Sequence, residues 1–319
     1  MRPRRGVALL AALWLVVAIA TVALQFSIEA RERRTVGILA SERGIQRAAA
    51  LGALAFTRAR LEQALRVAPT GTNVQRLRSS DPWMDADSLY SGPVLVDSMQ
   101  VDVVARDLGE RLNINRANET QLQTFFSFLL VDYSKATQLA QTIMDWRDVD
   151  SMPRPSGAER DAYIKAGMLA LPTNTPFREI EELQHVMGVT ADIYATVAPY
   201  LTTHGTAAVN LNTAPVAVLR ALPGMTDATL NRILQLRSQG QKISNIADVF
   251  PAMRVGGRRL PGQVASPAAL AQLNAQVSTN TQEVELTIIA RVGPQAPPTR
   301  LTAVVARQGT TAAVRTKLW

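Results

Sequence analysis

The sequence predicts an α+β fold in which a long N-terminal helix packs on a small antiparallel sheet and a large α-helical domain is inserted between the sheet segments. Three observations support this prediction. Residues 7–66 favour one long helix, residues 284–292 and 301–307 alternate between apolar and polar side chains, and residues 113–274 favour helices. With 319 residues, of which 47% are hydrophobic and 19% charged, the chain can bury a sizeable core.

Residues 7–24 form an apolar run in which Thr21 is the one polar side chain. A helix over this run is roughly 27 Å long, which matches the hydrocarbon thickness of a bilayer. Arg2, Arg4 and Arg5 precede it, so we expect a transmembrane helix whose N-terminus stays in the cytoplasm. A cleaved secretory signal is the alternative, but the run is longer than the usual apolar core of a signal peptide and continues without a clear small-residue cleavage site.

The helical character continues beyond the apolar run. There is no proline between Pro3 and Pro69, and an apolar stripe follows at Leu51, Leu54, Leu61 and Leu65. A continuous helix over residues 7–66 would be on the order of 90 Å long. This length exceeds what a membrane anchor needs and suits a subunit that packs by its N-terminal helix into a fibre. Residues 69–92, rich in Pro, Gly, Ser and Asp, are expected to form a loop.

Alternating side chains predict the sheet. Residues 98–115 favour a strand, a turn at Leu108-Gly109-Glu110 and a short second strand. Near the C-terminus, residues 284–292 and 301–307 alternate, and a turn at Gln308-Gly309 leads into a last strand over residues 312–319. Three consecutive strands at this spacing predict an antiparallel meander that can lie on the long helix.

The segment between the sheet strands, residues 113–274, repeats itself. The motif Leu112–Ala117 (LNINRA) is echoed by Val209–Ala214 (VNLNTA), and IMDWR, which ends at Arg147, is echoed by ILQLR, which ends at Arg237. Two further segments, LQHVMGV and LRALPGM, share the spacing of helix-hairpin-helix units, in which a glycine lets the hairpin turn tightly. We therefore expect a helical domain with helix-hairpin-helix-like repeats.

Helix-hairpin-helix units often bind DNA, because their backbone amides point at a phosphate. Here Thr190 and Thr226 stand where a second glycine is expected, and Asp192 and Asp227 follow closely. Carboxylates at these helix starts would repel a phosphate. Half of the net charge of +8 lies in residues 1–35, so the remainder is only weakly basic. We expect no nucleic-acid binding, and a membrane-anchored DNA receptor of the competence type is the alternative function.

The stretch DWRDVDSMPRPSGAERD is a candidate calcium site. Its carboxylates lie at the end of a predicted helix and just past a loop with two prolines and a glycine: Asp145, Asp148, Asp150, Glu159 and Asp161. Carboxylates that converge across a loop can bind calcium through about six to eight oxygens. The alternative interpretation is a solvated acidic loop in which Arg147, Arg154 and Arg160 pair with the acids.

The sequence does not favour an enzyme. It contains no cysteine, which excludes disulfides, thiolate zinc sites and a cysteine nucleophile. Its two histidines, His185 and His204, have no evident partner at the spacing that catalysis or metal binding requires. We predict no catalytic residue.

Several of these motifs resemble one known family, the minor pseudopilin K of type II secretion systems (general secretion pathway protein K). The basic leader MRPRRG is followed by an apolar helix that starts at Val7 and lacks the usual pilin glutamate at its fifth position, Ala11, as is typical of that family. The segments ERLNINRAN, DWRDVD with PRPSGAERDAY, FREIEELQHVMGV and VNLNTAPVAVLRALPGM resemble further family blocks. Arg147 departs from the pattern, since the family often has an apolar residue there.

The resemblance implies a pilin-like fold and a structural role. It implies cleavage by prepilin peptidase between Gly6 and Val7, with methylation of Val7, and a single-pass protein of the bacterial inner membrane with a cytoplasmic N-terminus and a periplasmic soluble domain. It further implies a place at the tip of a pseudopilus, beside the minor pseudopilins I and J, in the export of folded proteins across the outer membrane. Calcium in the insert is implied as well.

The expected domain organisation combines these elements. It comprises a leader (1–6), a transmembrane helix (7–24), the first part of a pilin-like domain (25–112), an inserted α-helical domain (113–274) and the C-terminal strands of the pilin-like domain (275–319).

Overall fold

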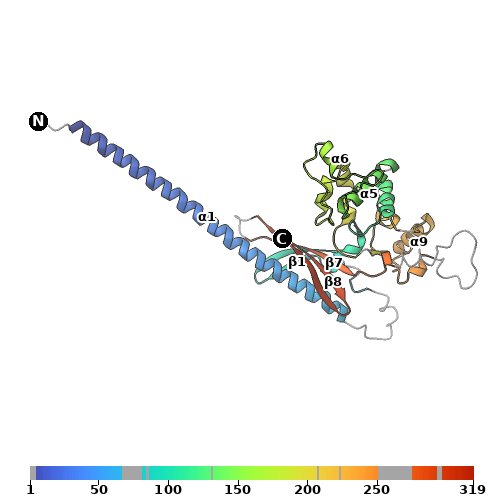
Figure 1. Ribbon diagram of the computed structural model, residues 1–319. Coiled ribbons are helices and arrows are strands. Elements are labelled where there is room, and N and C mark those ends of the chain that lie inside the picture. Colours follow the sequence, from blue (N-terminus) through green and yellow to red (C-terminus); the bar gives the residue numbers. More distant parts are fainter. Residues whose placement is uncertain are drawn as a thin grey trace, which may run out of the picture.

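A computed structural model of the chain describes residues 5–66, 81–83, 86–130, 132–206, 208–222, 224–250, 275–292 and 297–319. Helix α1 (Arg5–Arg66) is continuous, as predicted. Its N-terminal half projects away from the rest of the molecule, and its C-terminal half lies against a sheet (Figure 1). The first four leader residues, most of the expected loop and the last part of the insert lie outside the described residues.

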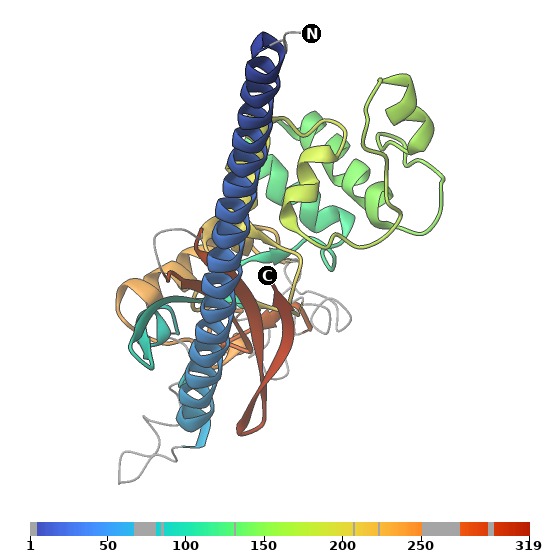
Figure 2. The same ribbon diagram turned by 90° about the vertical axis from the view of Figure 1, so that its left-hand side faces the viewer.

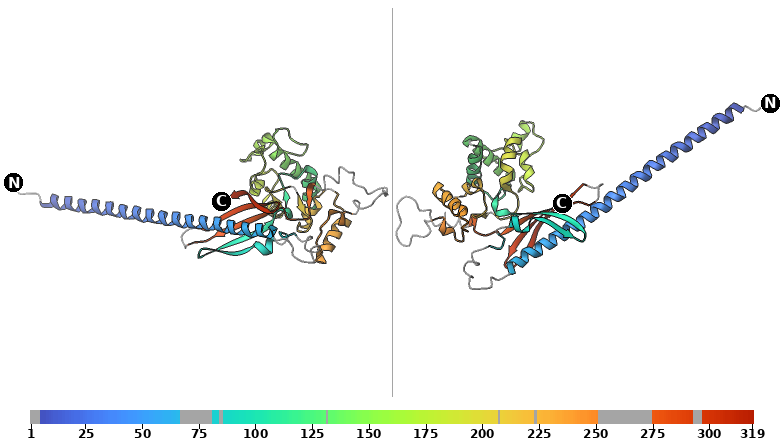
Figure 3. Two further views of the ribbon diagram at one scale, coloured as in Figure 1. Left: turned by 90° about the horizontal axis from the view of Figure 1, so that it is seen from below. Right: turned by 180° about the vertical axis from the view of Figure 1, so that it is seen from behind.

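The sheet has five antiparallel strands and lies along the C-terminal half of α1 (Figure 3). In spatial order the strands are β1 (Gly92–Val96), β2 (Met99–Asp107), β7 (Glu283–Ala290), β8 (Thr299–Gln308) and β9 (Thr311–Leu318). The insert separates β2 from β7 along the chain, yet the two strands pair directly, with Val103 opposite Ile288. Strands β7, β8 and β9 confirm the predicted meander, and Gly309 has the positive φ of 60° that its turn needs.

The prediction of a loop over residues 69–92 is wrong for its last residues. A short helix, α3, occupies Ala86–Tyr90, and β1 starts at Gly92 and pairs with β2. Strand β1 has only five residues, GPVLV, and it is held by hydrogen bonds to β2. Local β-propensity over so short a segment does not predict such a pairing.

One face of α1 is buried against the sheet. Ala49, Ala50, Ala53, Leu54 and Leu61 are buried there together with inward-facing strand residues. Small side chains let the helix approach closely, and a Cβ on Gly52 would lie 2.8 Å from a methyl group of Val96. Leu51 of the predicted stripe instead remains 41% exposed, so α1 also presents an apolar position to the outside.

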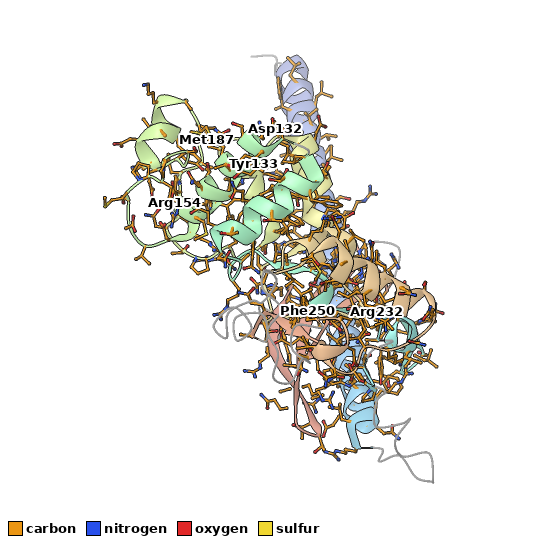
Figure 4. The ribbon with its side chains drawn as sticks, turned by 90° about the vertical axis from the view of Figure 1, so that its right-hand side faces the viewer. Asp132, Tyr133, Arg154, Met187, Arg232 and Phe250 are labelled. Carbon is orange, nitrogen blue, oxygen red and sulfur yellow. The ribbon has the colours of Figure 1, made fainter. Side chains whose placement is uncertain are left out.

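The insert has a hydrophobic core of its own, distinct from that of α1 and the sheet. The short helix η1 (Leu108–Glu110) leads from β2 into the insert. The helices of the insert are α4 (Glu119–Leu130), α5 (Tyr133–Arg147), α6 (Arg160–Lys165), η2 (Ile180–His185), α7 (Ala191–Val197), η3 (Ala198–Tyr200), α8 (Val216–Arg220), α9 (Asp227–Ser238) and η4 (Ile246–Asp248). Arg154 and Met187 lie in one lobe, and Arg232 and Phe250 lie in the lobe nearer the sheet (Figure 4).

Two short parallel ladders define the internal repeat. Strand β3 (Leu112–Asn113) pairs with β4 (Leu201–Thr202), and β5 (Val209–Asn210) pairs with β6 (Val277–Ser278). In each repeat one asparagine side chain satisfies distant backbone groups. The Nδ2 of Asn115 donates to the carbonyls of Phe177 and Thr203, and the Nδ2 of Asn212 donates to those of Ile243 and Thr279.

An arginine closes each repeat at the same two motif positions. Arg147 donates to the carbonyls of Ile114 and Ala117, and Arg237 donates to those of Leu211 and Ala214. Burial lowers the pKa of both guanidinium groups to about 10. Arg147, which departs from the family pattern, therefore has the same structural role as Arg237, and the repeat seen in the sequence is a repeat of tertiary contacts.

The predicted hairpins contain the expected turns. Gly188 and Gly224 have positive φ values of 89° and 73°, and the hydroxyls of Thr190 and Thr226 accept hydrogen bonds from the starts of α7 and α9. The assignment of these segments as helix-hairpin-helix units stays a prediction.

A buried carboxylate joins the two cores. Asp107 ends β2 and is 2% exposed, and its Oδ2 accepts hydrogen bonds from Asn210 Nδ2 at 2.8 Å, Thr213 Oγ1 at 2.7 Å and Thr281 Oγ1 at 3.1 Å. Its Oδ1 accepts from the backbone N–H of Gly109. Asn210 and Thr213 belong to the second repeat, so this side chain ties the insert to the sheet.

Candidate functional site

The N-terminal part of α1 is apolar and exposed. Trp14 and Phe26 are 71% and 74% exposed, and no part of the apolar window of this helix is buried inside the structure. By length and composition the window can cross a membrane, where the exposed side chains would contact lipid rather than water. The helix therefore fits a single-pass membrane anchor. Gly6 and Val7 lie in its first turn.

Three of the five predicted carboxylates come together in the insert. One oxygen each from Asp148, Asp150 and Glu159 lies within 4.8 Å of the others. Asp148 follows the last residue of α5, and Glu159 directly precedes α6. The loop between them, with Pro153 and Pro155, brings the two helix ends back to one another.

Glu159 shows why a cation fits this cluster. It is 6% exposed, and neither of its carboxylate oxygens has a hydrogen-bond partner among the described residues; the same holds for Oδ1 of Asp148. A buried carboxylate without a partner is costly. Burial, followed by the charges of Asp145 and Asp148, raises the pKa of Glu159. A divalent cation would supply the missing partner, and carboxylate oxygens are among the ligands that calcium takes.

Asp145 and Asp161 are placed differently. Asp145 is fully buried and accepts hydrogen bonds from Arg154, from Nη1 at 2.5 Å and from the backbone N–H at 3.1 Å. Gly157 makes room for it, since a Cβ there would lie 1.9 Å from Asp145 Oδ2. Asp161 is exposed in α6, outside the cluster of three. The geometry thus favours Asp148, Asp150 and Glu159, and a ligand role for Asp145 or Asp161 stays a prediction.

Of the three arginines of the alternative interpretation, Arg154 does pair with the acids. Its Nη1 contacts Asp145 and also Oδ2 of Asp148, at 2.6 Å. Arg147 instead binds backbone carbonyls, and Arg160 is exposed. Arg154 thus gives the loop an ion-pair network on its inner side, while residues 149–153, 155 and 156 are exposed.

Two residues that support this loop are not predictable from the acidic stretch. Gln141 of α5 donates to Glu119 of α4 at 2.8 Å and accepts from the backbone N–H of Ser156 at 2.6 Å. Glu119 also lies 3.6 Å from Nε of Arg154. Neither side chain stands in a motif, because the contact depends on how α4 packs against α5.

A membrane-spanning helix that continues along an antiparallel sheet defines a pilin-like subunit, and the inserted helical domain distinguishes this one. Two family models, both described as type II secretion system (T2SS), protein K, match residues 101–206 and 209–272, which together make up more than half of the chain. The chain belongs to the type II secretion system protein K family.

Curated relatives bear the same description. Type II secretion system protein K of Dickeya chrysanthemi is 33% identical over 82 residues, 25% of this chain and 22% of the relative. The Klebsiella pneumoniae protein is 32% identical over 111 residues, 33% of this chain and 34% of the relative. The matched segments thus span about a third or less of these relatives.

Among solved structures, the fold is similar to a chain in the crystal structure of the GspK-GspI-GspJ complex from the type 2 secretion system of enterotoxigenic Escherichia coli. The TM-score is 0.60 at 16% identity, over 91% of this chain and 98% of that chain. This likeness extends the shared fold beyond the segments that the family models match.

Proposed function

We propose that this chain is the minor pseudopilin at the tip of a type II secretion pseudopilus, where it helps to initiate assembly for the export of folded proteins. The observation that carries the proposal is the combination of a pilin-like core with a large insert, in a chain of the protein K family. A structural subunit needs no catalytic residue, and we propose no enzymatic activity for this chain.

The N-terminal helix suits a terminal position in the fibre. In a pilin-like fibre a glutamate at the fifth position of the helix neutralises the N-terminal amine of a neighbouring subunit, and an unpaired charge in lipid is costly. Ala11 stands at that position here, so it offers no partner to a subunit stacked above. The lobe of α5 and α6 also projects to one side of α1 (Figure 2), where we expect a repeated subunit to collide with it.

The competence-type DNA receptor is not favoured. In the first turn of α9 the backbone N–H of Thr229 already donates to the hydroxyl of Thr226, and Asp227 is paired with Arg220 at 2.8 Å. The carboxylate of Asp227 at this helix start disfavours a phosphate at the same place.

For localisation, we propose that α1 anchors the protein in the bacterial inner membrane, with a cytoplasmic N-terminus and the sheet and insert in the periplasm. Arg2, Arg4 and Arg5 hold the leader on the cytoplasmic side.

We predict that prepilin peptidase cleaves between Gly6 and Val7 and that Val7 is then methylated. Gly6→Val should abolish cleavage, because a branched side chain would crowd the scissile bond. Gly37→Val, in the same helix with open space around it, should leave cleavage unchanged. N-terminal sequencing and intact mass of the membrane-extracted protein measure both. An uncut Met1, or a new N-terminus near residue 25, would refute the assignment.

We propose calcium binding by Asp148, Asp150 and Glu159. Calcium should raise the melting temperature of the chelator-treated protein by about 5 °C at saturation, because a ligand that binds the folded state stabilises it by mass action. Asp148→Ala or Asp150→Ala should remove most of this shift, whereas Asp161→Ala, a matched change of an exposed acid, should preserve it. Coincident melting curves with calcium and with chelator would contradict the proposal.

We propose that minor pseudopilins I and J contact the outward face of α1 rather than the insert. Leu51 is exposed on that face, and Leu169 is fully exposed in the insert. Leu51→Glu should weaken co-purification with I and J in detergent at least about tenfold, because a charge would be buried at a helix contact. Leu169→Glu should have little effect. The opposite ranking would assign the contact to the insert. Leu54 and Leu61 are unsuitable for this test, since both are buried in the core of the chain itself.

A further inference from the structure

We propose that Arg154 is a built-in counter-ion that competes with the divalent cation for Asp148, so that it keeps the acidic loop folded without metal and sets the affinity for metal. The inference rests on the cation site proposed above. Arg154 belongs to the loop between Asp148 and Glu159 and contacts Asp148 of the cluster. Figure 4 shows where Arg154 lies in its lobe of the insert.

Asp148 is shared between two sites. Its Oδ2 accepts a hydrogen bond from Arg154 Nη1 at 2.6 Å, whereas its Oδ1 is buried without a partner. The same carboxylate belongs to the cluster with Asp150 and Glu159. A cation in that cluster and the guanidinium group of Arg154 would thus share one carboxylate, and two positive charges so close together repel each other.

The other contacts of Arg154 show what it does without metal. Its side chain and backbone both donate to Asp145, which is fully buried, and its Nε lies 3.6 Å from Glu119 of α4. Arg154 therefore holds the loop to α5 and α4 at once. These contacts neutralise Asp145, outside the cluster, and leave Glu159, whose carboxylate oxygens have no hydrogen-bond partner among the described residues, for the cation.

Two consequences follow for metal binding. Removing the positive charge should tighten the binding of the divalent cation, because the cation then meets an uncompensated Asp148. The same change should destabilise the metal-free protein, because Asp145 becomes a buried carboxylate with one fewer partner. If Arg154 had only a structural role, its removal would destabilise the metal-free protein without tightening the binding of the cation.

The test uses the full chain in detergent, with calcium titrated calorimetrically into the chelator-treated protein. Arg154→Gln should bind calcium at least about tenfold more tightly than the native chain and should melt at a lower temperature in chelator. Arg154→Lys keeps the positive charge, although it lacks the planar donor geometry of a guanidinium group. Its calcium affinity should therefore stay within about threefold of that of the native chain. Arg160→Gln removes an exposed arginine from the same segment and controls for net charge; its affinity should also stay within about threefold.

Each outcome decides the proposal. Unchanged or weaker calcium binding by Arg154→Gln, with native binding by Arg160→Gln, overturns the role of Arg154 and leaves the metal site intact. Equal tightening in Arg154→Gln and Arg160→Gln assigns the effect to overall charge and also overturns it. If neither the native chain nor Arg154→Gln binds calcium, the cation site itself is wrong and the inference fails with it. If Arg154→Gln does not fold, Arg154→Ala replaces it in the titration, and calcium binding by Arg154→Ala that is no tighter than that of the native chain overturns the proposal.

Discussion

Asp107→Ala is expected to lower the free energy of unfolding by about 4 kcal/mol, a large part of the stability of an ordinary domain. The substitution removes the acceptor of four hydrogen bonds and leaves the donors of Asn210, Thr213 and Thr281 buried around an empty space. Because these donors come from the insert and from the chain leading into β7, the loss should loosen the insert from the sheet. Chemical denaturation of the full chain in detergent, followed by circular dichroism, measures the effect.

A control for Asp107 lies five residues earlier in the same strand. Asp102 is half exposed and makes a surface ion pair with Arg291 at 2.8 Å. Asp102→Ala should therefore cost no more than about 1 kcal/mol. Equal losses for the two variants would mean that the network around Asp107 does not hold the two cores together.

Arg237→Met and Arg147→Met are each expected to cost about 2–3 kcal/mol. Methionine preserves much of the packing of the arginine stem, but two buried backbone carbonyls in each repeat lose their donors. Part of this loss is offset, because burial already disfavours the charge, as the lowered pKa of about 10 indicates for both arginines. The same denaturation measurement applies.

Arg232 provides the matched control for this pair. It lies on α9, five residues before Arg237, but it is exposed, and among the described residues its side chain donates a hydrogen bond to Gln235 alone. Arg232→Met should change stability by less than about 0.5 kcal/mol. A large loss for Arg237→Met with none for Arg147→Met would show that the two repeats do not use their arginines in the same way.

The long helix and the meander could be predicted because their signals are local. Helical spacing and strict alternation each extend over many residues of α1, β7, β8 and β9, so neighbouring positions reinforce one another. Strand β1 could not be predicted in the same way, since it is short and depends on β2 for its hydrogen bonds.

The recurring motifs indicate a repeat, but they do not indicate the tertiary contacts that the two repeats share. Asn115 and Asn212 bond to carbonyls that lie 31 to 88 residues away, and no pattern within a window of the sequence indicates such contacts. Asp107 was missed for the same reason, because its partners stand 103, 106 and 174 positions later.

The candidate metal site was predictable in composition but not in geometry. The acidic stretch indicates which residues can converge, whereas the division of Asp145 from Asp148, Asp150 and Glu159 depends on the path of the loop around Gly157 and on the reach of Arg154. The spacing of the acidic residues along the chain predicts neither the path of the loop nor the position of Arg154.

The central claim is that this chain occupies a single terminal position in a pseudopilus. The most direct measurement is the native mass of the detergent-extracted, processed protein, alone and after mixing with minor pseudopilins I and J. The account predicts no homopolymer in the first case and a complex with one copy of each subunit in the second. Filaments formed by this protein alone, or a mixture in which it does not join I and J, would contradict it.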